Sequence, residues 1–264
     1  MNNLKSFFKK PVQKVEDTSN APKSASAIFQ EQVRQGMAEH RRSPAGLFIS
    51  AMAAGLEVGF TLFLSGIIYS MYVGVVSEST MHLLLAVSYP IGFIFVIIGR
   101  SELFTEHTTL AVIPVLNRST NVKSLLKLWG IIFLGNIIGG YIMAFILTRF
   151  GPAMNIISES AFGALALKMT DHSNLVILGS SVLAGWLMGQ LSWLVTSSQE
   201  TMSRITMVLL VTSLIGLGGL HHSIVGSIEV FAGVLTGDVT LSEYFRFQWI
   251  TTFGNIIGGV VFVS

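Results

Sequence analysis

Charge and cysteine are what this sequence has least of. Asp, Glu, Lys and Arg make up only 11% of the chain, and no cysteine occurs among the 264 residues. Soluble domains carry roughly 25% charged residues, so charge this sparse cannot cover a surface in contact with water. The mean hydropathy of +0.67 therefore indicates that lipid is the main solvent. The absence of cysteine excludes disulfides, thiolate metal sites and cysteine nucleophiles.

Positive charge is absent from the loop around "VVSEST" and concentrated at the amino terminus, where eight of the sixteen Lys and Arg precede residue 43. Basic residues remain on the cytoplasmic side, so this bias predicts a cytoplasmic amino terminus in the plasma (inner) membrane. Residues 1–26 are predicted to be a flexible basic tail with no role in nucleic-acid binding. Residues 27–43 are predicted to form an amphipathic helix with Phe29, Val33 and Met37 on one side.

Long apolar runs fill the rest of the chain. A helix that crosses about 30 Å of hydrocarbon needs about 20 apolar residues. The expected spans are 45–74, 82–99 with its continuation, 125–148, 174–197, 204–215 with its continuation, and 247–264. The prediction is an all-α membrane protein with six transmembrane helices over residues 44–264 and both termini in the cytoplasm. Spans two and five are broken, at "RSELFTEHT" and "GLGGLHHS".

The hexamer "GNIIGG" occurs twice, at 135–140 and again 119 positions later at 254–259. Glycines four apart let helix backbones approach closely, and Asn136 and Asn255 can bond across helices. A nucleotide-binding loop would need a strand, a turn and a helix, which this context does not offer. The repeat divides the chain into halves of about 45–148 and 174–264. Each half has three spans, so the second half is predicted to be inverted relative to the first.

The two breaks fall at equivalent places in the halves. Non-helical backbone at membrane depth is tolerated only inside protein or along a wet cavity, so paired breaks predict a pathway at the midplane. In the first break, Leu103 and Phe104 could narrow this pathway and Thr105 could offer a hydroxyl. In the second, His222 shares a helix face with Glu229 and could pass a proton. A structural role for these side chains is the alternative.

Three further residues have open interpretations. Glu57 lies within an apolar span, where it could titrate or could simply bond a buried hydroxyl or amide. Lys168 precedes span four and could lie at the mouth of an outer vestibule or in a solvated loop. His221 could be functional or structural. No metal site is predicted, because adjacent histidines do not share a helix face and no third ligand completes a set.

The stretches "SELFTEHT" and "HHSIVGS", with the doubled "GNIIGG", resemble the formate/nitrite transporter family over about residues 28–264. The resemblance implies an aquaporin-like fold, a homopentamer with one pore per protomer, and no cofactor. It places Thr105 on the loop threonine, His222 on the central pore histidine and Leu103 at one constriction. Phe93 is expected beside Leu103. Tyr89 and Ile215 are expected at the other constriction, and Lys168 near a lysine that draws anions inward.

This resemblance implies a non-enzymatic channel whose partners are a small monovalent anion, a proton and the bilayer. Formate is the expected substrate. Nitrite, hydrosulfide, lactate and acetate stay open, as does a proton-coupled secondary transporter centred on Glu57 and Glu229. A water channel is disfavoured because no Asn-Pro dipeptide occurs. A scaffold would need no paired breaks, and an intramembrane enzyme lacks a visible oxyanion site beside Ser223.

Overall fold

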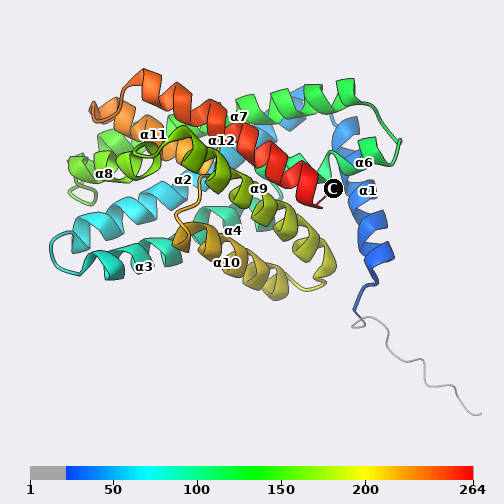
Figure 1. Ribbon diagram of the computed structural model, residues 1–264, viewed down its shortest axis with the longest axis horizontal. Coiled ribbons are helices and arrows are strands. Elements are labelled where there is room, and N and C mark those ends of the chain that lie inside the picture. The colour runs from blue at the N-terminus through cyan, green and yellow to red at the C-terminus, as the bar shows by residue number, and fades with distance from the viewer. Residues whose placement is uncertain (1–21, 264) are drawn as a thin grey trace, which may run out of the picture.

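The computed structural model describes residues 22–263, and the regular structure in this range is α-helical (Figure 1). The helices run in the order α1 Ala25–Arg41, α2 Pro44–Tyr72, α3 Glu78–Ser88, α4 Pro90–Gly99, α5 Phe104–Leu110, α6 Ile113–Leu116, α7 Val122–Ala153, α8 Glu159–Thr170, α9 Asn174–Ser197, α10 Thr201–Leu217, α11 Val225–Thr236 and α12 Leu241–Val263. The expected tail lies mostly outside the described residues.

Four helical stretches in the described range are long and apolar enough to cross a membrane: α2, α3 with α4, α7 and α9. Helices α10 and α11 are apolar but shorter. The last helix begins at Leu241, earlier than the expected 247. A reciprocal cap explains this start, because the Glu243 carboxylate accepts from the Thr240 N–H (2.8 Å) and the Thr240 hydroxyl accepts from the Glu243 N–H (3.2 Å).

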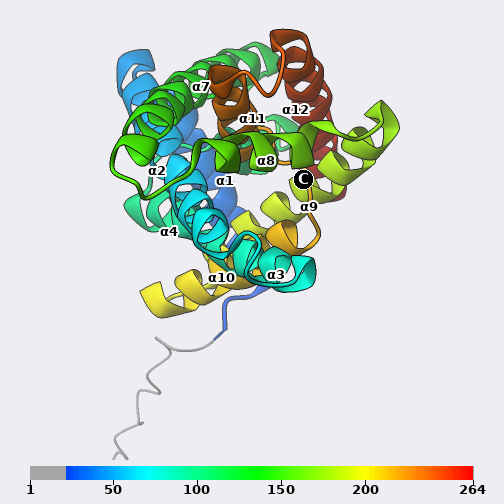
Figure 2. The ribbon, with the colours of Figure 1, turned by 90° about the vertical axis from the view of Figure 1, so that its left-hand side faces the viewer.

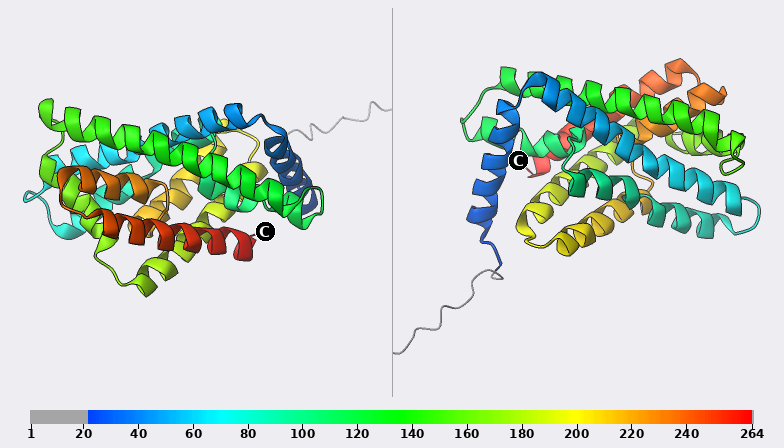
Figure 3. Two further views of the ribbon diagram at one scale, coloured as in Figure 1. Left: turned by 90° about the horizontal axis from the view of Figure 1, so that it is seen from above. Right: turned by 180° about the vertical axis from the view of Figure 1, so that it is seen from behind.

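Helix α8 was not expected from the sequence. It begins after Ser158 with Glu159 in its first turn, a helix-start signal that the apolar pattern around it obscured. Figure 2 shows α8 lying across the end of the molecule that faces the viewer, where it packs against α11. Figure 3 shows α1 at the opposite end. We call these the α8 end and the α1 end.

Helix α1 packs against the fold through a face next to its apolar side. Its buried residues are Ile28, Gln32 and Gly36, whereas Phe29 is 37% exposed. A side chain at Gly36 would collide with the backbone of Leu110, so this glycine allows α1 to approach the end of α5 closely. The helix also starts at Ala25 rather than 27, because the Ser24 hydroxyl accepts from the Ala27 N–H.

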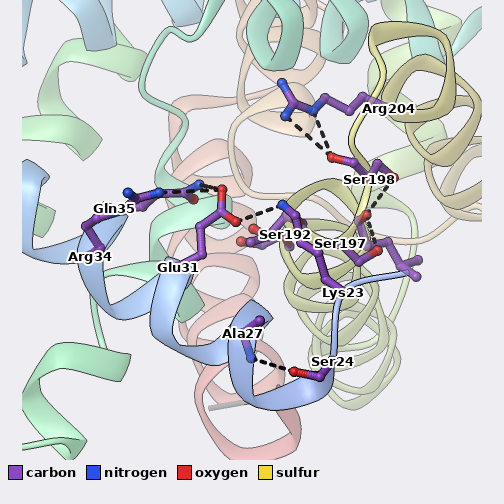
Figure 4. Close-up of polar contacts among 12 residues, drawn as sticks. Lys23, Ser24, Ala27, Glu31, Arg34, Gln35, Ser192, Ser197, Ser198 and Arg204 are labelled. Atoms are coloured by element: carbon purple, nitrogen blue, oxygen red, sulfur yellow. Dashed lines mark hydrogen bonds and ion pairs between the residues drawn. The ribbon is translucent and has the colours of Figure 1, made fainter. Parts of the chain in front are cut away.

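The start of α1 is fixed by a lysine that the expected tail contained. The Lys23 ammonium donates to a Glu31 carboxylate oxygen and to the Thr196 carbonyl, both at 2.7 Å (Figure 4). This contact joins α1 to the last turn of α9. The amino-terminal helix is therefore a packed part of the fold at the α1 end.

Candidate functional site

Two segments interrupt helices in the interior. Between α4 and α5 the chain is non-helical at 100–103, where Arg100 adopts a left-handed φ of 59°. Between α10 and α11 it is non-helical at 218–224, where Gly219 has a φ of 57°. The first segment falls in "RSELFTEHT", although most of "ELFTEHT" is already helical, and the second overlaps "GLGGLHHS" and extends one residue beyond it.

An asparagine from each "GNIIGG" segment satisfies the backbone of one break. The Asn136 amide oxygen accepts from the Phe104 N–H (2.8 Å) and its NH₂ donates to the carbonyls of Glu102 and Ala51 (2.7 Å each). Since buried backbone groups are costly to leave unpaired, this one side chain stabilises the first break.

The second break has the same arrangement. The Asn255 amide oxygen accepts from the Ser223 N–H (2.8 Å), and its NH₂ donates to the carbonyls of His221 (3.1 Å) and Ser181 (2.7 Å). Both asparagines are fully buried. The prediction that Asn136 and Asn255 bond across helices is confirmed.

The breaks bring Thr105 and His222 into contact. The Thr105 hydroxyl lies 2.7 Å from His222 Nε2, although the residues are 117 positions apart. Both are buried, with 0% and 1% of their surface exposed. The break between α10 and α11 therefore presents the imidazole to the first turn of α5.

The backbone around His222 selects a tautomer for the neutral ring. The N–H groups of Ile224 and Val225 both point at Nδ1, each at 3.3 Å. Because two donors face Nδ1, this atom accepts and the proton of the neutral imidazole lies on Nε2. His222 then donates to the Thr105 hydroxyl, whose own hydrogen remains available for an acceptor.

Aromatic and aliphatic side chains lie next to this pair. The Phe93 ring meets the His222 ring edge to face at 5.2 Å, and Tyr89 lies 5.4 Å beyond Phe93. Leu103 and Ile215 are fully buried in the same apolar cluster as Phe93. The structure thus brings His222 into contact with Thr105 and Phe93, with Tyr89 beyond Phe93, while Leu103 and Ile215 share the main apolar core with Phe93.

A small cavity opens from this region toward the α8 end. Its volume is about 80 Å³, and Tyr89, Ile215, Lys168 and Glu229 all line it. Lys168 lies in the last turn of α8, and its side chain is exposed. Glu229 comes from α11 and is 7% exposed. We call this space the Lys168 cavity.

A larger cavity of about 410 Å³ lies at the α1 end. Basic and acidic side chains from α1, the first break, α5 and α10 line this cavity. They include Arg34, Arg100, Arg204, Glu102, Glu106 and His107. At its wall, Glu102 pairs with Arg42, which does not itself line the cavity, and the other Glu102 oxygen lies 2.5 Å from His107 Nε2. Sequence reasoning missed this cluster because Arg42 is 60 positions from its partner.

Phe104 and Glu57 do not join the group around His222. The Phe104 ring packs edge to face against Trp129 and Phe133 of α7, at 6.0 and 5.1 Å. Its packing gives no support to a role in narrowing the pathway. Glu57 accepts a hydrogen bond from Ser101 and lines neither cavity.

His221 has structural partners on both ring nitrogens. Nδ1 lies 2.8 Å from the Ser180 hydroxyl, and Nε2 lies 3.1 Å from the Met169 carbonyl. These bonds tie the second break to α8 and α9. Among residues 22–263 no group of three metal-ligating side chains occurs.

Comparison with known proteins identifies the class. The family model described as "Formate/nitrite transporter" matches residues 26–264, so the chain belongs to the formate/nitrite transporter family and is an integral membrane protein. "Inner membrane protein YfdC" of Escherichia coli K12 is 34% identical over 92% of this chain and 77% of its own length. "Nitrite transporter NirC" of Salmonella typhimurium is 27% identical over 84% of this chain and 82% of its own.

Solved structures share the fold. A chain named "FNT family ion channel" superposes with a TM-score of 0.79 at 23% identity, covering 90% of this chain and 96% of that one. A "Pentameric formate channel with formate bound" gives a TM-score of 0.67 at 18% identity, covering 83% of this chain and 94% of that one. This likeness supports the all-helical fold.

Proposed function

We propose that this protein is a channel for small monovalent anions, with formate as its principal substrate. The observation that carries the proposal is the buried Thr105–His222 bond, held between two helix breaks with a cavity toward each end. Non-helical backbone at membrane depth is tolerated only inside protein or along a wet cavity, and paired breaks beside two cavities support a pathway for a polar molecule. The relatives named "Probable formate transporter" and "Formate channel FocA" support formate.

The proposed assembly is a homopentamer of six-span protomers, built from two inverted halves, with one pore in each protomer. The pentameric formate channel of similar fold supports this assembly. We place the α1 end in the cytoplasm because the basic residues concentrate near the amino terminus. The Lys168 cavity then faces the outside.

The proposed mechanism follows from desolvation. Moving an anion out of water costs several kcal/mol even after relaxation, so the apolar side chains of Phe93, Leu103 and Ile215 reject the ion. Protonation removes most of this cost. An anion drawn toward Lys168 crosses as the neutral acid, and its carbonyl oxygen accepts the free hydroxyl hydrogen of Thr105. The neutral His222 fixes that hydroxyl by donating to its oxygen.

The test is formate flux into liposomes that contain the purified full chain, followed by light scattering over a pH series. We expect flux that rises with acidity and falls at least about tenfold, or 1.4 kcal/mol in barrier, in His222→Asn. His172→Asn is the matched control, because His172 lies exposed in the loop between α8 and α9. No flux above empty liposomes for formate, nitrite or hydrosulfide would refute the channel proposal.

A proton-coupled secondary transporter is the second candidate function. It is favoured by Glu106 and Glu229, two carboxylates that line opposite cavities and make no hydrogen bond within residues 22–263. A secondary transporter would show saturable uptake that speeds up when substrate is present on the far side. A channel would show neither behaviour, so the two functions separate in one flux assay.

A further inference from the structure

Glu229 is a buried acidic group that the proposed mechanism does not use. Its side chain is enclosed by the fold, with 7% of the residue surface exposed, and it lines the Lys168 cavity. Within residues 22–263 the carboxylate forms no hydrogen bond and no ion pair. An enclosed carboxylate without a partner is costly, and taking up a proton reduces that cost. A functional role for the Glu229 carboxyl group would explain why it is buried at this cost.

The surrounding titratable groups are mostly engaged elsewhere. His82 of α3 places Nε2 2.7 Å from the Leu217 carbonyl. The hydroxyls of Tyr141 on α7 and Tyr244 on α12 bond to each other, and Tyr244 also meets Ser227 of α11 at 2.8 Å. Tyr89 is packed against Phe93.

Lys168 remains as the charged neighbour of Glu229 in the cavity. The two do not form an ion pair with each other, so each can act on a molecule held between them. A volume of about 80 Å³ exceeds the roughly 30 Å³ share of one water. The cavity therefore accepts a molecule of a few non-hydrogen atoms, such as a small carboxylate.

His222 is poorly arranged to supply a proton. Its Nδ1 accepts from two backbone N–H groups and its Nε2 faces Thr105. Protonating Nδ1 would set a third N–H against the two donors, and losing the Nε2 proton would create an imidazolate. The ring is thus built as a neutral hydrogen-bond donor, and the proton that crosses with the substrate has another source.

We propose that Glu229 is the proton donor of the Lys168 cavity, so that a weak-acid anion is already neutral when it leaves this cavity toward Phe93 and Leu103. This inference rests on the proposed anion-channel function. The anion first meets the Lys168 ammonium. The Glu229 carboxyl O–H then breaks as a new O–H forms on the substrate oxygen, and the remaining Glu229 carboxylate recovers a proton from water on the α8 side.

The arrangement also selects among anions. A weak-acid anion can accept the proton and leave the cavity as a neutral molecule. An anion of a strong acid, such as chloride, stays charged and meets both the apolar side chains and the carboxylate. Glu229 is therefore a specificity-determining residue for weak acids.

The test compares Glu229→Gln with the unaltered chain at about pH 7 and at about pH 4.5 in liposomes. Carboxylic acids titrate near pH 4, so external formic acid is scarce at the first pH and plentiful at the second. At about pH 7 we expect the formate flux of the variant to be about tenfold below that of the unaltered chain. At about pH 4.5 we expect the two fluxes to agree within about twofold, because the external solution then contains the neutral acid. Glu159→Gln is the matched control, because Glu159 begins α8 with an exposed side chain.

Glu229→Asp is the second variant, since it keeps a carboxyl group but withdraws it by one methylene. We expect partial flux at about pH 7, and this comparison carries the test if the Gln variant does not assemble. An unchanged pH profile in both variants would overturn the inference. So would increased formate and chloride flux in Glu229→Gln, which would assign the carboxylate to simple repulsion.

The inference and the proposed function fail in distinguishable ways. Flux that requires His222 but is indifferent to Glu229 would overturn the proton-donor role and leave the channel intact. An absence of flux in the unaltered chain would overturn both.

Discussion

The two helix breaks share an anchor but differ in their chemistry. Asn136 and Asn255 each accept one backbone N–H and donate to two carbonyls. Around the first break, Glu102 joins Arg42 and His107 in a charged cluster. Around the second, His221 bonds neutral partners, Ser180 and Met169. The repeated hexamer therefore encodes the anchor, and the residues outside it determine whether the surroundings of each break are charged or neutral.

Removing an anchor is expected to have the largest effect. Asn136→Ala and Asn255→Ala each leave one buried N–H and one buried carbonyl of the break unpaired, and each unpaired group costs about 1–3 kcal/mol. We expect both variants to lose the assembled protein on size-exclusion chromatography in detergent. Equal losses would support equivalent anchors. Normal assembly in one variant would show that its break is held by other contacts.

The second-largest effect is expected from substitution of the glycines in the two hexamers. A Cβ at Gly139 would collide with the Met52 carbonyl, and one at Gly258 with the Val182 carbonyl, both of them backbone atoms. We expect Gly139→Ala and Gly258→Ala to cost about 1–3 kcal/mol of stability, measured as a fall in melting temperature.

Gly130 and Gly179 provide the controls, because nothing lies within 4 Å of a Cβ at either position. Alanine there is expected to be neutral or stabilising by up to about 1 kcal/mol. If all four variants lost stability alike, close backbone packing would not be the reason for the repeated spacing of glycines in the two hexamers.

Substitution of Thr105 tests the role of its hydrogen bond with His222. Thr105→Val keeps the shape but removes the hydroxyl between His222 and the pathway. We expect formate flux to fall about tenfold, or 1.4 kcal/mol, while Thr105→Ser retains most of it. Flux in Thr105→Val equal to that of the unaltered chain would remove the hydroxyl from the mechanism.

The smallest expected effects distinguish the charged break from the neutral one. Arg42→Gln removes a partly exposed ion pair, and Ser180→Ala removes a neutral bond to His221. Each is expected to cost about 1 kcal/mol in thermal unfolding. The loss from Arg42→Gln should shrink with added salt and that from Ser180→Ala should not. If both variants responded to salt in the same way, the first break would not differ from the second in being held by charged side chains.

Much of the site was predictable because it depends on short patterns. The apolar runs, the two interruptions and the repeated Asn within "GNIIGG" all act locally, and they located Thr105 and His222. Helix α8 escaped prediction because its apolar residues resemble the spans beside it. The residues through which α1 packs were not predicted, since Gly36 rather than the apolar stripe decides how closely that helix approaches α5.

The sequence by itself determined that this chain is a membrane protein. It also located the long apolar helices and the segments that interrupt them, because these follow from hydropathy and backbone propensity over a few residues. Only the tertiary structure decided that Lys168 and Glu229 line one cavity, that Phe104 packs against α7, and that the backbone fixes the tautomer of neutral His222. These features depend on contacts between side chains far apart in the chain, and no local pattern specifies such contacts.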